Sequence, residues 1–122
     1  MALTLETGLR NVLADAIDTE VGAAGFLQFE TSGDVEVATI TFGNPAFGAA
    51  STGTITLSGT PLSDTNATGG TVAQFSIYKS GPTKLLEGTV ATSGADINIT
   101  SVAIAATETV TLTSFTITVP AS

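Results

Sequence analysis

Cysteine and histidine are both absent from this sequence of 122 residues. Without them the chain can form no disulfide, no thiolate or imidazole zinc site, and no Ser-His-Asp or Cys-His relay. Tryptophan is absent too and tyrosine occurs once, so a stacking platform for a sugar ring would have to consist of phenylalanine. Because these absences remove most hydrolase mechanisms, we expect a protein that is not an enzyme and needs no cofactor.

Basic residues are scarce as well. Lys and Arg number 3 against 11 Asp and Glu, which gives a net charge of -8. Since cations neutralise phosphates and attach proteins to anionic lipid, we expect neither nucleic acid nor a membrane as a partner. No apolar run reaches the length of a membrane span. The opening MALTLETGLRNVLADAID lacks the basic and apolar regions of a secretory signal, which predicts a protein made and used without export.

The residues that are present favour short strands and tight turns, because Thr, Gly, Ala and Val dominate the composition. We predict one mostly β structural domain: an N-terminal amphipathic α-helix within 1–25, followed by an antiparallel β-sandwich or jelly-roll-like unit over 26–122. The expected strands are Phe26–Thr31, Val35–Phe42, Gly53–Ser58, Val72–Lys79, Lys84–Thr92, Asp96–Val102 and Thr107–Val119.

Turn chemistry separates these strands. Ser-Gly-Asp at 32–34 and Ser-Gly-Pro at 80–82 predict hairpins. The polar, Gly- and Thr-rich segment Ser58–Thr71 is predicted to be the longest exposed loop. GNPAFG at 43–48 is interpreted as a strand terminator, with Phe42 and Phe47 filling the core.

An apolar stripe marks the helix, which we expect from Thr7 to about Ala24. Thr7 is the predicted N-cap, and the glycines of 22–25 supply the C-terminal stop. A helix of this length is marginal by itself in water, so either its own domain or another subunit must cover the stripe. The candidate interface residues, spaced as one helical face, are Leu5, Leu9, Val12, Leu13, Ile17 and Val21.

The last predicted strand changes phase once. Thr alternates with Val110 and Leu112, and then the apolar positions resume one residue late at Phe115 and Ile117. Strict alternation would send one of these two sets outward, so we predict a β-bulge near Ser114 that buries both.

Acidic residues offer the remaining candidate chemistry. Asp64 and Asp96 both lie in predicted loops, and a pair of carboxylates is the minimum for glycoside hydrolysis. The fragments at 64–66 and 96–98 also resemble pieces of a calcium loop, but neither continues with the glycine and distant Glu of an EF-hand. Turn capping is the favoured interpretation of both, and a small hydrolase stays the third-ranked hypothesis.

Three segments resemble small proteins encoded beside the head genes of tailed bacteriophages and prophages. They are TGLRNVLADAI, ATITFGNPAFGAASTGTITL and LLEGTVATSGADINITSVAIAATETVTLTSFTIT, which together span most of the chain. The relatives open their helix with the same Thr-Gly-Leu-Arg-Asn, here 7–11. Their late turn reads Gly-Thr-Ser-Gly-Ala-Asp, where this chain has Ala91 in place of the first Gly. The relatives also often carry a Trp within 72–79, which this chain lacks.

This resemblance implies a capsid decoration, or cement, protein. Such a protein would be made in the host cytoplasm and would sit on the outer capsid surface of the virion. It would bridge subunits of the major capsid protein and associate with itself, most simply as a homotrimer at three-fold positions. The second hypothesis is a tail, collar or spike module that binds a host surface glycan. The resemblance assigns no catalytic residue and no metal.

Overall fold

The computed structural model describes residues 3–122, and within them the protein is mostly β, with 39% strand and 12% helix. This confirms the predicted β-rich domain with one N-terminal helix. One helix, α1 (Thr7–Val21), precedes all the strands. The strands are β1 (Phe26–Glu30), β2 (Glu36–Thr41), β3 (Thr54–Thr56), β4 (Leu62–Asp64), β5 (Gly70–Thr71), β6 (Gln74–Lys79), β7 (Thr83–Ala91), β8 (Ile97–Asn98), β9 (Ala103–Ile104), β10 (Val110–Leu112) and β11 (Thr116–Thr118).

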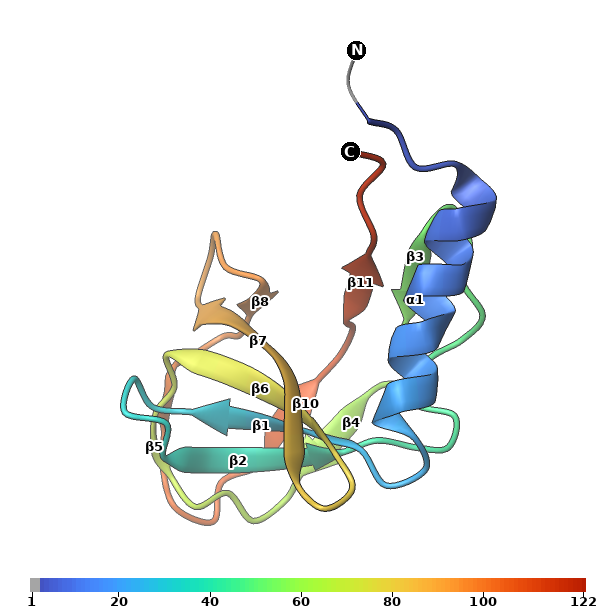
Figure 1. The fold of residues 1–122 in the computed structure, drawn as a ribbon. Helices are drawn as coiled ribbons and strands as arrows, with labels where there is room; N and C mark the ends of the chain where they lie inside the picture. The colour runs from blue at the N-terminus through green and yellow to red at the C-terminus, as the bar shows by residue number, and fades with distance from the viewer. Residues whose placement is uncertain (1–2) are drawn as a thin grey trace.

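A five-stranded sheet with the order β2-β1-β6-β7-β8 forms the body of the molecule (Figure 1). The turns at 32–34 and 80–82 close the β1-β2 and β6-β7 hairpins, as predicted. The β7-β8 pair is parallel, whereas the other pairs of this sheet are antiparallel. Alternation along β1 buries Leu27 and Phe29 on the inner face of the sheet and directs Phe26, Gln28 and Glu30 to the other face.

Three two-stranded ladders complete the fold: β10-β4, β11-β3 and β5-β9. The first and third correct the prediction that Ser58–Thr71 is a single exposed loop, because β4 and β5 both lie inside it. The segment also buries Ala67 in the core. Its short, polar strands gain their order from distant partners, so local composition gave no sign of them.

The chain changes sheets at Ser114. Val110–Leu112 pairs with β4, whereas Thr116–Thr118 pairs with β3 in a separate ladder. The predicted break is therefore at the predicted place, but it is a switch of partner and not a bulge within one ladder. Phe115 is buried between the two strands, while Ile117 is only half-buried.

Helix α1 begins at Thr7 and ends three residues earlier than predicted, because Gly22 adopts a positive φ of 71°. Glu6 occupies the N-cap position without a side-chain cap bond, which corrects the assignment of Thr7 to that role. The helix stands beside β3 and β11 at the end of the molecule where both termini lie (Figure 1). Leu5 N donates to Ala121 O at 2.6 Å, so the two terminal segments are hydrogen-bonded to each other.

Phenylalanine rings connect the layers of the core. Phe47 packs against Phe42 and Phe115 with ring centroids 5.8 and 6.3 Å away, and Phe115 meets Phe75 of β6 edge-on at 5.5 Å. Phe42 and Phe47 are both buried, as the interpretation of 43–48 predicted. These ring contacts pack the loop after β2 against the β10-β11 connection, and that connection against the central sheet.

Candidate functional site

Helix α1 is attached to its domain largely through polar side chains. Arg10 Nε donates to Val119 O at 2.8 Å, and its Nη2 donates to Thr52 O at 3.0 Å. Asn11 Oδ1 accepts from Gly53 N at 2.8 Å. The guanidinium lies so close to Gly53 that an added Cβ would meet it at 2.8 Å. One turn of the helix therefore holds both the loop before β3 and the segment after β11.

Two acidic residues continue this attachment along the helix. Asp15 Oδ1 accepts from Ala50 N at 2.8 Å, and Asp18 Oδ1 accepts from Phe47 N at 3.0 Å. Each carboxylate accepts from a backbone N–H of the loop that leads into β3. This loop has few ladder partners of its own, so the two acceptors supply hydrogen bonds that strands do not. The sequence carries no signal for these two hydrogen bonds, because acidic residues off an apolar stripe ordinarily face water.

These polar contacts rotate the helix away from the orientation that hydrophobicity alone predicts. Ala14 and Val21 are buried, and Ile17 packs half-buried against the core. Of the six predicted interface residues, Val21 and Ile17 thus cover the domain itself, and Leu5 is half-buried beside the C-terminal segment. The other three predicted residues, Leu9, Val12 and Leu13, are exposed.

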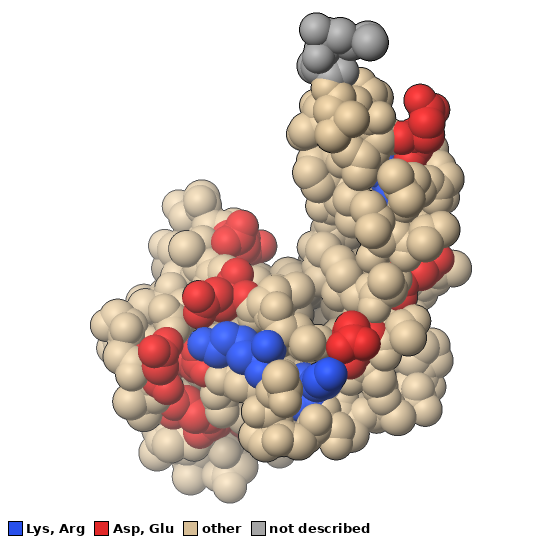
Figure 2. Space-filling view, in the orientation of Figure 1, with Lys and Arg blue, Asp and Glu red and all other residues tan. Residues whose placement is uncertain are grey.

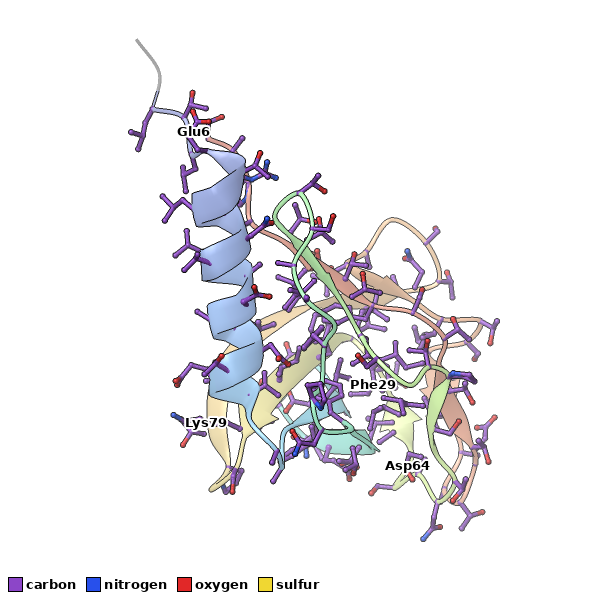
Figure 3. All side chains as sticks on the ribbon, turned by 90° about the vertical axis from the view of Figure 1, so that its right-hand side faces the viewer. Glu6, Phe29, Asp64 and Lys79 are labelled. Atoms are coloured by element: carbon purple, nitrogen blue, oxygen red, sulfur yellow. The ribbon has the colours of Figure 1, made fainter. Side chains whose placement is uncertain are left out.

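The outward face of α1 is the candidate functional surface. The exposed fractions are 52% for Leu9, 64% for Val12 and 41% for Leu13. Figure 3 shows the helix along one side of the domain, with side chains projecting away from the sheet on its free side. Leu3, just before the helix, is exposed as well. Leu9, Val12 and Leu13 are three and four positions apart and so share one helix face, and clustered apolar side chains mark a protein-binding site more often than scattered single residues do.

The two candidate acids are held apart. Asp64 accepts from Thr39 N of β2 and from Asn66 N, both at 2.9 Å. Asp96 accepts from Thr89 N of β7 at 2.9 Å and from the Thr89 hydroxyl. Since β1 and β6 lie between β2 and β7, three strand spacings of about 4.8 Å separate the two sites along the sheet. That separation exceeds the reach of a glycosidase pair.

Both carboxylates accept from backbone N–H groups, and the bond from Asn66 N to Asp64 is the local cap that the turn-capping interpretation predicted, whereas Thr39 N lies 25 positions from Asp64. Asn98 acts in the same way, because its Oδ1 accepts from Ala95 N at 3.0 Å. Across residues 3–122, no group of three or more potential metal ligands is found. Within the same range, no helix is long and apolar enough to cross a membrane.

A buried carboxylate is the feature that sequence reasoning missed. Glu30 is 1% exposed, although it belongs to the outer face of the sheet. Its Oε1 accepts from Ser76 Oγ at 2.8 Å and from Gln74 Nε2 at 3.3 Å, and its Oε2 accepts from Tyr78 OH at 3.0 Å. The three donors lie on β6 directly across from β1, so the register of the two strands was the only signal that could have revealed the cluster.

The cluster shifts the pKa of Tyr78. Burial raises the pKa of its phenol above the ordinary value of 10.0, and the hydrogen bond and negative charge of Glu30 raise the pKa further. The ring also stacks on Phe26 with centroids 5.1 Å apart. Every buried polar side-chain atom of the cluster has a hydrogen-bond partner within the protein, so the cluster joins β1 to β6 through side chains as well as backbone.

Lysines and acids alternate on the face that Figure 2 presents, where a short basic stripe lies between groups of acidic side chains. Lys79 Nζ is 3.0 Å from Glu20 Oε1, and Lys84 Nζ is 3.4 Å from Glu87 Oε2. With Arg10 engaged by backbone carbonyls, all three cations of the chain have partners within the molecule.

Comparison with known proteins gives no identification. The chain matches no protein-family model, and neither the curated proteins nor the solved structures contain a significant match to it.

Proposed function

We propose that this protein is a structural subunit of a larger assembly, specifically a decoration protein on the outer capsid surface of a tailed-phage virion. The single observation that carries the proposal is the orientation of α1. Polar side chains hold the helix, while Leu9, Val12 and Leu13 remain in water. Full burial of such a side chain contributes about 1.5–3 kcal/mol, and covering the part of each that is still exposed would contribute roughly half of that, which favours a protein partner over solvent.

The occupants of this face are other copies of the chain and the major capsid protein. A homotrimer brings three helices together and leaves the acidic sheets outward, where like charges stay apart. Residues 7–17, 38–57 and 85–118 resemble small proteins encoded beside phage head genes, and this resemblance supports the capsid as the surface to which such a trimer binds. Such a subunit would act by bridging neighbours and adding contacts, with no reaction.

Light scattering on the purified protein tests the helix face. We expect a species of three times the monomer mass and, for Val12→Asp, the monomer mass. Val35→Asp is the matched control, because Val35 is 61% exposed, close to Val12, and lies in the β1-β2 hairpin away from the helix. The control should keep the mass of the wild type. A monomeric wild type at all concentrations would remove the self-association from the proposal.

Reconstruction of a virion that carries this protein tests the location. We expect density for it on the outer shell, contacting the major capsid protein. Density on the tail, collar or spike, together with binding to a defined saccharide on a glycan array, would favour the second hypothesis. Absence from the particle would end both.

A further inference from the structure

A groove of about 640 Å³ lies between two consecutive legs of the chain. The first leg runs over 96–104 and contains β8 and β9, and the second runs over 108–116 and contains β10. The turn between Ala105 and Glu108 joins them, closed by a 3.2 Å bond from Glu108 N to Ala105 O. The legs thus resemble an opened hairpin whose two strands do not pair with each other.

Each leg contributes to the lining of the groove a strand that is paired on one side only. β8 pairs with β7 on one side, and β10 pairs with β4 on one side. Over residues 3–122 no other strand pairs with either of them. An unpaired edge presents a row of backbone N–H and C=O groups, which is the template for strand addition. Two such edges on one groove can pair with both sides of a single inserted strand.

The size of the groove fits an extended segment. A residue in a packed sheet takes about 3.3 Å along its strand, about 4.8 Å across it and about 10 Å through the sheet, or about 160 Å³. The groove therefore has room for about four residues. Val110 and Leu112 are already buried in the core, whereas Thr109, Thr111 and Thr113 are exposed, so the second leg offers hydroxyls and backbone more than apolar anchors.

Charge defines what kind of segment fits. Asp96 and Glu108 line the groove, and no Lys or Arg does. Hydrogen bonds from the backbone N–H and the hydroxyl of Thr89 hold the pKa of Asp96 below its ordinary value, so its carboxylate stays ionised at neutral pH. A second copy of this chain is a poor occupant, because it carries a net charge of -8 and its three cations already have partners.

We propose that this groove accepts an extended, lysine- or arginine-bearing segment of another protein, which adds as a strand between β8 and β10. Backbone pairing to the two edges supplies the affinity, and the two carboxylates select for cationic side chains. The inference is independent of the helix face, because no residue of α1 lines the groove.

Titration calorimetry with short synthetic peptides tests the proposal. The probe is acetylated and amidated Lys-Thr-Val-Thr-Val-Lys. The first control replaces both lysines by glutamate, and the second keeps the lysines but carries N-methyl groups on alternate amides. Loss of two backbone hydrogen bonds should weaken the methylated peptide by at least about tenfold. In the full-length protein, the amides of 97–100 and 109–113 should exchange more slowly with the probe bound.

Variants locate the binding and test the role of charge. Asp96→Asn with Glu108→Gln keeps the acceptor oxygens of both side chains but removes their charges, so the probe should bind more weakly and with less salt dependence. Glu6→Gln with Glu20→Gln removes the same charge elsewhere and should bind like the wild type, as should Val12→Asp. Failure of the probe to bind, or equal binding of the methylated peptide, would overturn the proposal. Slowed exchange in these legs caused by protein concentration alone would assign the groove to a second copy and overturn it as well.

Discussion

Glu30 shows how strongly one residue's surroundings depend on strand register. On β1 it shares the outer face of the sheet with Phe26 and Gln28, which are both partly exposed. The Glu30 side chain is nevertheless enclosed, because Gln74, Ser76 and Tyr78 of β6 all donate hydrogen bonds to it. A carboxylate buried among neutral donors is stabilised by hydrogen bonds more than by ion pairing. The three donors lie 44 to 48 positions after Glu30 in the sequence, so the cluster could not be predicted from a local pattern.

Tyr78 gives a direct spectroscopic test, because it is the only tyrosine and the chain has no tryptophan. Absorbance at the tyrosinate band should titrate with a midpoint above 10.0 in the folded protein. Glu30→Gln should move that midpoint downward, since the amide retains an acceptor oxygen but lacks the negative charge.

The same shift fixes the sign of a pH effect on stability. A phenol whose folded-state pKa lies above its unfolded value contributes stability that is complete below pH 10.0 and is lost as the pH rises through the folded value. Tyr78→Phe should therefore unfold with less pH dependence than the wild type just above pH 10.0. Urea denaturation at a series of pH values above 10.0 measures the free energy of unfolding of both proteins. An equal dependence of that free energy on pH in the two proteins would contradict this role of Tyr78.

Phe115 tests the switch of partner at the end of the chain. Phe115→Ala should lower the free energy of unfolding by about 3–5 kcal/mol, because the ring fills the space between Phe47 and Phe75. Thr113→Ala, at an exposed position two residues earlier, should change it by less than about 0.5 kcal/mol. Urea denaturation measures both, and a loss below about 1 kcal/mol for Phe115→Ala would place the ring outside the core.

At the scale of elements, prediction worked where local chemistry decides the structure. Both hairpins, with turns at 32–34 and 80–82, formed as predicted, and the residue with positive φ is Asp34 in the first turn and Gly81 in the second. Gly22 ended the helix by the same logic. β4 and β5 were missed because each is very short and pairs with a distant segment. The three residues of β4 pair with residues 46 or more positions later, and the two residues of β5 pair with residues about 33 positions later.

The orientation of α1 shows the limit of hydrophobic periodicity. The stripe correctly identified a helix but not the face that meets the domain, because Arg10, Asn11, Asp15 and Asp18 bind loop backbone that ladders leave free. Those carbonyl and N–H groups would otherwise lose their partners, and this cost decides the rotation. Leu9, Val12 and Leu13 were therefore predicted as members of an apolar stripe, but the sequence did not show that these three, rather than Ile17 and Val21, would face outward.

Two glycines test the attachment of the helix. Gly53 and Gly59 have nearly equal positive φ values of 78° and 72°, so alanine at either incurs a similar backbone strain. Only at Gly53 would the new Cβ strike Arg10. Gly53→Ala should cost about 1.5–3 kcal/mol more than Gly59→Ala in urea denaturation, because it displaces hydrogen bonds made by a charged group. Equal costs would mean that Arg10 does not hold the helix.

Across the whole molecule, the net charge of -8 predicts opposite salt effects for the two proposed surfaces. Self-association through the apolar helix face should strengthen as salt rises, because screening reduces repulsion between acidic subunits. Binding of the lysine peptide to the groove should weaken over the same range. Light scattering and calorimetry from low salt to about 1 M, where the Debye length is about 3 Å, measure both. Parallel trends would show that one of the two surfaces is misassigned.

The bond from Arg10 to Val119 spans 109 positions in the chain, and it bears on the order in which the protein is made. Because a ribosome makes a chain from its N-terminus, helix α1 is made before both of its anchors, at Gly53 and at Val119. A lone helix of 15 residues is only marginally formed in water. The orientation of α1, and with it the exposed face of Leu9, Val12 and Leu13, is thus fixed only after Val119 has been made.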